Sequence, residues 1–127
     1  MVLALRGAIR VESDTSDAVR TASIRIVHEM CSRNELAEED IVSIVFSVTA
    51  DLRSANPATC LRRNGFTHTP LFCVQEAEVE GSMTRVIRVL MTVEIPLPRG
   101  QTAGRARQTA AHVYLDGAEA LRPDLDA

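Results

Sequence analysis

Apolar stretches of strand length alternate with polar turns along the chain, a pattern that predicts five β-strands. The fourth stretch is almost continuously apolar, as expected for a strand buried within a sheet. The third is broken by Pro70, and the first is closed by Gly7. The predicted strands are residues 2–6, 41–48, 66–79, 85–95 and 112–115.

Two helices are predicted between these strands. Residues 15–33 carry apolar side chains at helical spacing, and we expect Asp14 to cap this helix and Asn34 to end it. A second, short helix is expected to begin at Pro57, because proline suits the first helical position. Asn56 is then its N-cap.

These elements predict a single α+β domain over residues 1–127, with a mixed five-stranded sheet packed on one long and one short helix. Residues 99–111 are polar and are predicted to form a mobile connection. The long helix covers one face of the sheet, yet the other face is also apolar. We therefore expect this second face to be buried against other copies of the chain.

Composition and charge exclude several classes of partner. All 14 basic residues are arginine, the net charge is −3 and no basic stripe is present, which argues against nucleic acid. The apolar runs are too short to span a membrane, and the N-terminus lacks the features of a signal peptide. Three widely spaced cysteines favour a reduced, cytoplasmic protein. His28 and Cys31 lie one helical turn apart, but two ligands alone do not make a zinc site.

Arg88 is the anomalous residue of the fourth strand, since it is a charge within an apolar run. A guanidinium cannot lose its proton to escape burial, so it needs an anion beside it. Glu76 on the preceding strand could be that anion, in a purely structural ion pair. Alternatively, Arg88 faces a bound anionic ligand. The strand alone leaves both interpretations open.

With these elements placed, the chain resembles the chorismate mutases of the trimeric, pseudo-α/β-barrel class, as distinct from the all-helical class. The tail block and the pairing of CVQE with IRVLM are its most specific features. Residues 99–111 have no counterpart in the family and look like an inserted loop. Four blocks carry the resemblance: RGAIRVESDT (6–15), FSVTADLRSANPA (46–58), PLFCVQEAEVEGSMTRVIRVLMT (70–92) and HVYLDGAEALRPDL (112–125).

The resemblance implies a pseudo-α/β-barrel homotrimer with active sites in the clefts between neighbouring subunits. It implies the Claisen rearrangement of chorismate to prephenate, in the shikimate pathway of aromatic amino acid biosynthesis. This pericyclic step requires no nucleophile, general base, metal or cofactor. The protein must hold the compact conformer of its small-molecule substrate and stabilise the negative charge that develops on the ether oxygen.

The resemblance also implies roles for individual residues. Arg88 matches the arginine that contacts the ether oxygen, Arg6 an arginine that holds a carboxylate, and Glu76 the glutamate that binds the ring hydroxyl. Cys73 matches a cysteine near the same hydroxyl, although strict alternation puts Cys73 and Glu76 on opposite faces of a strand. The remaining substrate-binding positions are Asn56, Ala58, Thr59, Arg62, Leu71, Phe72, Tyr114, Leu121 and Arg122.

Three positions depart from the family pattern. Asn56 stands where members often have Phe, Thr59 where some have Lys beside a carboxylate, and Phe72 is bulkier than expected. We interpret them as changes in affinity or substrate, in primary or specialised metabolism, and not as loss of the chemistry. Two other functions stay open: an enzyme acting on isochorismate or another enol-pyruvyl ether, and a non-catalytic trimeric binding module.

Overall fold

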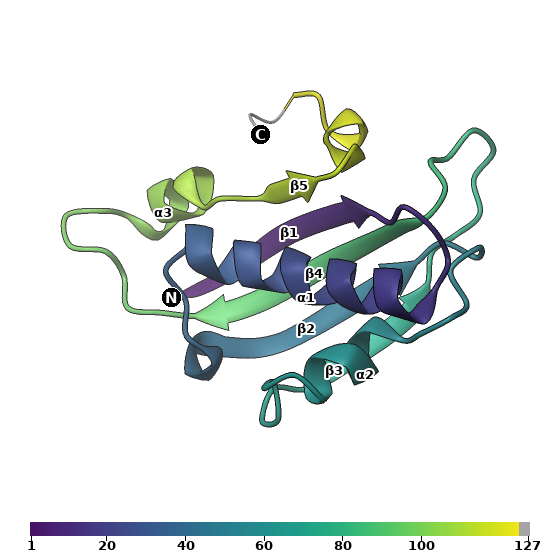
Figure 1. Cartoon of the computed structure of the whole chain (residues 1–127). Helices are drawn as coiled ribbons and strands as arrows, with labels where there is room; N and C mark the ends of the chain where they lie inside the picture. Colours follow the sequence, from purple (N-terminus) through teal and green to yellow (C-terminus); the bar gives the residue numbers. More distant parts are fainter. Residues whose placement is uncertain (125–127) are drawn as a thin grey trace.

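The structure, a computed structural model, describes residues 1–124 as one mixed β-sheet with helices beside it (Figure 1). The five predicted strands are confirmed, as is the α+β class. The strands are β1 (Val2–Arg10), β2 (Ile41–Val48), β3 (Leu71–Gln75), β4 (Val86–Glu94) and β5 (Val113–Leu115). The helices are α1 (Ser16–Arg33), α2 (Pro57–Arg62) and α3 (Ala103–Thr109), with 3₁₀ turns η1 (Glu38–Asp40) and η2 (Ala118–Leu121).

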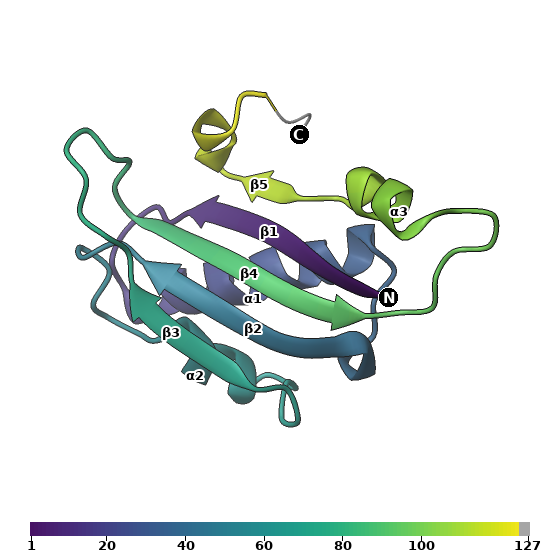
Figure 2. The same ribbon diagram turned by 180° about the vertical axis from the view of Figure 1, so that it is seen from behind.

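The order of strands across the sheet is β3-β2-β4-β1-β5. β4 pairs antiparallel with both β1 and β2, while β3 and β5 run parallel to their neighbours. Helices α1 and α2 lie on one side of the sheet (Figure 1), whereas no helix crosses the opposite side (Figure 2). We call this uncovered side the bare face.

The core lies between α1 and the sheet. The apolar positions of α1 recur every three or four residues, so they fall on the single stripe that faces the strands. The helix begins after Thr15, whose side chain accepts from the Ala18 N–H, and it ends at Asn34. The buried positions of α1 are Val19, Ala22, Ser23, Ile26, Val27 and Met30.

Two predictions at the start of the chain were wrong. β1 does not end at Gly7 but continues to Arg10. Gly7 is not in a turn; its lack of a side chain allows α1 to pack closely against the strand. Asp14 is not the N-cap of α1; its carboxylate instead accepts the backbone N–H groups of Arg53 and Ser54, each at 3.0 Å. These hydrogen bonds lower the pKa of Asp14, the one from Ser54 contributing most.

The irregular connection predicted for residues 99–111 contains helix α3. Thr102 caps it by accepting from the Arg105 N–H, and Ala106 is the buried residue of the helix. Two hydrogen bonds of 2.9 Å hold the end of this segment: the Asn34 side chain donates to the Ala111 carbonyl and accepts from the Ala111 N–H. The fold therefore has a second short helix, which the polar composition of this segment concealed.

The bare face carries several exposed apolar side chains, together with the polar and charged residues described below, and no helix of the described residues covers it. Side chains alternate across each strand, so one set points to α1 and the other points to this face. Within residues 1–124 no helix has the length and apolar character needed to cross a membrane. The large apolar side chains exposed on the bare face are Val2, Val45, Phe72, Val74 and Leu90.

Candidate active site

The sheet register places the central charged residues in two neighbouring rows on the bare face. Ser47 and Ala8 are the Cα partners of Arg88 on either side of it. Tyr114 extends this row through its pairing with Ala8. In the next row, Arg6 is the partner of Leu90, two residues along β4 from Arg88. Residues separated by more than 80 positions in sequence are thus adjacent because their strands pair.

Arg88 and Glu76 form an ion pair, one of the two partnerships that the apolar strand left open. The Arg88 Nε lies 3.6 Å from the Glu76 Oε1, within ion-pair range but beyond hydrogen-bonding distance. The Arg88 side chain is 42% exposed and that of Glu76 32%, so the pair is at the surface of the described chain rather than in its core. Nevertheless the Nε atom itself is buried, with no hydrogen-bond acceptor among residues 1–124. This N–H is thus a buried donor whose nearest recorded oxygen, Glu76 Oε1, lies just beyond hydrogen-bonding distance.

Ser47 is the site residue that sequence reasoning missed. Its hydroxyl donates to the Glu76 Oε2, while the other carboxylate oxygen faces Arg88. A signal was present, since Ser47 is a polar residue within the apolar run of β2. Glu76 follows the last residue of β3, and its backbone N–H donates to the Val48 carbonyl at 2.8 Å.

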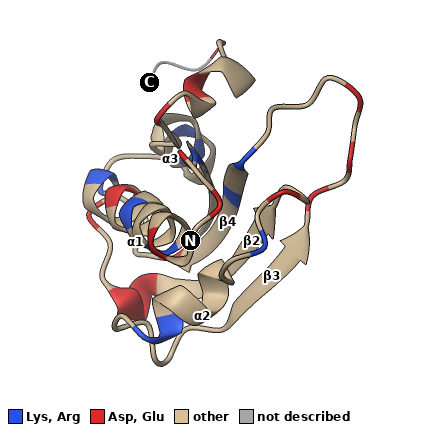
Figure 3. Cartoon of the chain, turned by 45° about the vertical axis from the view of Figure 1, so that its right-hand side comes forward, with Lys and Arg blue, Asp and Glu red and all other residues tan. Residues whose placement is uncertain are grey.

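Arg88 borders two cavities. One, of about 220 Å³, is also lined by Arg6, Ser47 and Tyr114. The other, of about 500 Å³, is lined by Glu76 and by the connection between β3 and β4. Arg88 belongs to the lining of both cavities. Figure 3 shows the charges of this region, with acidic segments along the connection and a basic segment on β4.

The C-terminal segment brings further predicted residues to this side. Leu121 packs beside Tyr114 in a small apolar cluster. Arg122 forms a bidentate pair with Asp124, with hydrogen bonds of 3.0 and 2.8 Å. This pair raises the pKa of Arg122 and lowers the pKa of Asp124. We call Arg6, Glu76, Arg88, Tyr114, Leu121 and Arg122 the arginine-face group.

His112 connects this group to the backbone of β1. Its Nδ1 accepts the Arg6 backbone N–H at 3.0 Å. This bond assigns the tautomer, since Nδ1 must be unprotonated to accept. Burial lowers the pKa of His112, and the nearby charges of Arg6 and Arg122 lower it further. His112 is thus held neutral beside two arginines.

The other predicted residues lie apart, at the β3 edge and on α2. Asn56 caps α2, as predicted, by accepting from the Ala58 N–H at 2.9 Å. Helix α2 lies on the opposite side of the sheet from Arg88 (Figures 1 and 2). Leu71 and Cys73 face the side of α2, whereas Phe72 faces the bare face from β3, the strand beyond β2. One chain therefore does not bring the α2 residues, Leu71 and Cys73 together with Arg88 around one small molecule. We call Asn56, Ala58, Thr59, Arg62, Leu71, Phe72 and Cys73 the α2–β3 group.

Cys73 does not point with Glu76. It pairs with the buried Phe46 and packs against the main core, and burial raises the pKa of its thiol. β3 has no bulge, so the strict alternation that places Cys73 and Glu76 on opposite faces holds in this chain. A contact of Cys73 with the substrate hydroxyl stays a prediction. The backbone N–H groups of even-numbered residues of β3 point to β2, which leaves that of Cys73 at the free edge of the sheet.

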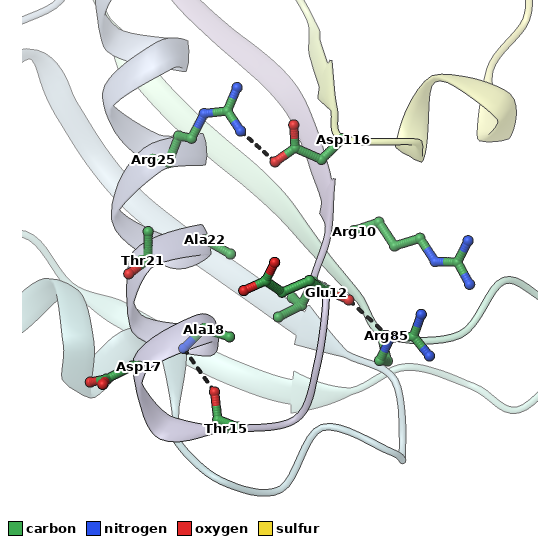
Figure 4. A pocket seen from close by; sticks show the side chains of 11 residues that line it. Arg10, Glu12, Thr15, Asp17, Ala18, Thr21, Ala22, Arg25, Arg85 and Asp116 are labelled. Atoms are coloured by element: carbon green, nitrogen blue, oxygen red, sulfur yellow. Dashed lines mark hydrogen bonds and ion pairs between the residues drawn. The ribbon is translucent and has the colours of Figure 1, made fainter.

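A separate cavity of about 530 Å³ lies between α1 and the end of β1 (Figure 4). Two of its arginines are paired: Arg25 forms an ion pair with Asp116, and Arg85 donates from Nε to the Val11 carbonyl. The Nε of Arg10 is buried without an acceptor among residues 1–124. Arg10 donates to a threonine hydroxyl on the connection before β4. None of the residues predicted for the site lines this cavity. We therefore place the candidate site on the bare face.

Comparison with known proteins identifies the family of the chain. A family model for chorismate mutase type I matches residues 2–125. The chain belongs to the chorismate mutase type I family. The chorismate mutase AroH of Bacillus subtilis (strain 168) is 34% identical over 126 residues, covering 98% of this chain and 93% of that protein. AroH of Thermus thermophilus is 38% identical over 128 residues, covering 100% and 98% respectively.

A solved chorismate mutase, from Clostridium thermocellum, has the same fold. Its TM-score is 0.81 at 38% sequence identity, and the match covers 92% of this chain and 97% of that chain. The family, the fold class and the chorismate mutase type of isomerase expected from the sequence are thus confirmed. Among residues 1–124, no three His, Cys, Asp or Glu side chains are grouped so as to hold a metal ion.

Proposed function

We propose that this chorismate mutase rearranges chorismate to prephenate on the bare face of its sheet. The observation that carries the proposal is Arg88, whose buried Nε–H lacks a hydrogen-bond acceptor among residues 1–124 and whose side chain borders two cavities. A polar donor preorganised in this way suits an oxygen that gains negative charge during the reaction. The substrate is a dianion, which suits a site rich in arginine.

Each member of the arginine-face group has a distinct role in this proposal. As the ether bond lengthens, its oxygen becomes more negative and the Arg88 guanidinium binds it more strongly than in the ground state, which accelerates the step. Arg6 and Tyr114 line the same cavity and hold a carboxylate of the substrate. Glu76 accepts a hydrogen bond from the ring hydroxyl. Leu121 and Arg122 close over the site.

We further propose that the site is completed by a second copy of the chain, in a homotrimer of the pseudo-α/β-barrel type. Except for Phe72, the α2–β3 group lies across the sheet from Arg88, and in this proposal a neighbouring copy supplies it to a ligand bound at Arg88. The exposed apolar side chains of the bare face, Phe72 and Leu90 among them, support burial between copies. In this arrangement Cys73 contributes its backbone N–H at the sheet edge rather than its thiol.

A cytoplasmic location completes the proposal. Cys31, Cys60 and Cys73 are all free thiols, as is usual in a reducing compartment.

The test follows the loss of chorismate by absorbance and identifies prephenate by acid conversion to phenylpyruvate. We expect Arg88→Ala to lower kcat by a factor of roughly 10² to 10³, the usual effect of removing one preorganised donor. Arg88→Lys keeps the charge but not the planar fork and should recover little of this loss. Arg33→Ala, on the far end of α1 and paired only with Glu29, is the control and should turn over normally. A folded wild-type protein without turnover would overturn the proposal.

A further inference from the structure

We propose that Ser47 is a positioning residue of this active site, which sets the orientation of the Glu76 carboxylate toward Arg88 and the substrate. The inference rests on the proposed function, in which Glu76 accepts the ring hydroxyl. It concerns how the glutamate is held, and it assigns a role to a strand residue outside the set predicted from the sequence.

The geometry of the three residues carries the inference. Ser47 is the Cα partner of Arg88 in the antiparallel pair of β2 and β4, so their side chains emerge side by side on the bare face. The Ser47 hydroxyl donates to one oxygen of Glu76, and the other oxygen lies 3.6 Å from the Arg88 Nε. The carboxylate is therefore held between a neutral donor and a cation.

A second partner is needed because Glu76 has a long side chain outside the regular strand. Its backbone is fixed by the hydrogen bond to Val48, but the side-chain torsions beyond it are free to rotate. Attraction by Arg88 alone would draw the carboxylate onto the guanidinium as a closer, bidentate pair. Such a pair would occupy the N–H groups that the ether oxygen requires. The Ser47 hydrogen bond keeps the carboxylate at ion-pair distance and leaves the Arg88 Nε free.

The size of Ser47 fits the same role. It lines the cavity shared with Arg6, Arg88 and Tyr114, and it is only half-buried. A larger side chain at this point would fill the cavity, and alanine would keep its shape but lose the donor. Serine therefore combines a donor with an open cavity.

The experiment is a double-mutant cycle between Ser47 and Glu76, with kcat and KM measured for chorismate. We expect Ser47→Ala to lower kcat/KM roughly tenfold, with most of the loss in kcat, because the closer ion pair weakens Arg88 in the transition state. Ser47→Thr retains the hydroxyl and should recover most of the activity. In a Glu76→Gln background, Ser47→Ala should change kcat/KM less than twofold, since the carboxylate it orients is gone.

Controls separate positioning from folding. Ser43 lies on the same strand and the same face, opposite Thr92, and Ser43→Ala should leave kcat and KM unchanged. If Ser47→Ala fails to fold, Ser47→Cys replaces it as a near-isosteric, weak donor. Equal losses from Ser47→Ala in both backgrounds, or no loss in either, would overturn the inference. Wild-type protein without turnover would instead overturn the proposed function, and this inference with it.

Discussion

Gly7 of β1 lies directly against Met30 of α1: a Cβ on Gly7 would come within 2.4 Å of the Met30 Sδ. Met30 is fully buried, so its side chain has little room to move away. We expect Gly7→Ala to lower the free energy of unfolding by about 1 to 3 kcal/mol, as overpacking usually does. Urea unfolding at one fixed protein concentration measures this, since assembly makes stability depend on concentration.

Gly104→Ala is the matched control for this substitution. Gly104 lies within α3, and a Cβ there would meet no atom within 4 Å. Alanine should therefore stabilise the chain slightly, by about 0.5 to 1 kcal/mol, through its helix propensity. Equal effects of the two substitutions would show that Gly7 is not required for close packing.

Mixed assemblies test the sharing of a site between copies. One variant, Arg88→Ala, disables the arginine-face group of its own chain. The other, Thr59→Glu with Arg62→Glu, places negative charge on α2, which repels the dianionic substrate. Each alone should be nearly inactive. Refolded together in equal amounts, they should recover about a quarter of the wild-type activity, because each mixed trimer regains one intact site of three. No recovery from assembled mixtures would show that each site belongs to a single chain.

Thr59 is expected to limit affinity for the substrate. A hydroxyl is a weaker partner for a carboxylate than an ammonium group, and Thr59 is half-buried on α2 beside exposed positions. We expect Thr59→Lys to lower KM roughly tenfold with kcat nearly unchanged, since the contact is equal in ground and transition states. Steady-state kinetics on chorismate measure both constants. An unchanged KM would mean that Thr59 does not adjoin the carboxylate.

The pH dependence of stability should report His112. Its pKa is lowered from 6.5 in the folded chain, so the unfolded chain takes up the proton first as the pH falls. Stability linked to His112 is therefore fully present above about pH 6.5 and declines below that value, until the pH reaches the lowered pKa. Unfolding measured between about pH 5 and 8 should show this decline in the wild type.

His112→Asn supplies the comparison for this prediction. Its amide oxygen can accept the Arg6 N–H without titrating. The difference between the two proteins isolates His112 from the carboxylates that also titrate at low pH. Parallel curves for wild type and variant would contradict the assignment.

The amino-acid sequence by itself determined the strands, the two predicted helices and the family. Periodicity is a local property, and it identified β2 at its observed limits and the capping of α2 by Asn56. It also singled out Arg88, because a charge inside an apolar strand is evident whatever the position of that strand in the fold. The family blocks then named Arg6, Glu76 and Tyr114 from parts of the chain that no local pattern connects.

Only the tertiary structure decided which of these residues meet. Strand pairing placed Ser47 beside Arg88 and Arg6 in the next row, and such contacts between distant segments have no local signature. The same alternation turned Cys73 into the core, away from Glu76. The sequence alone suggested that Gly7 ends the first strand, whereas the structure shows that it lets α1 pack closely against β1. Glycine suits both a turn and a close contact between elements, so the residue type could not distinguish them. Local periodicity determines which elements form, whereas their pairing and packing determine which side chains share a site.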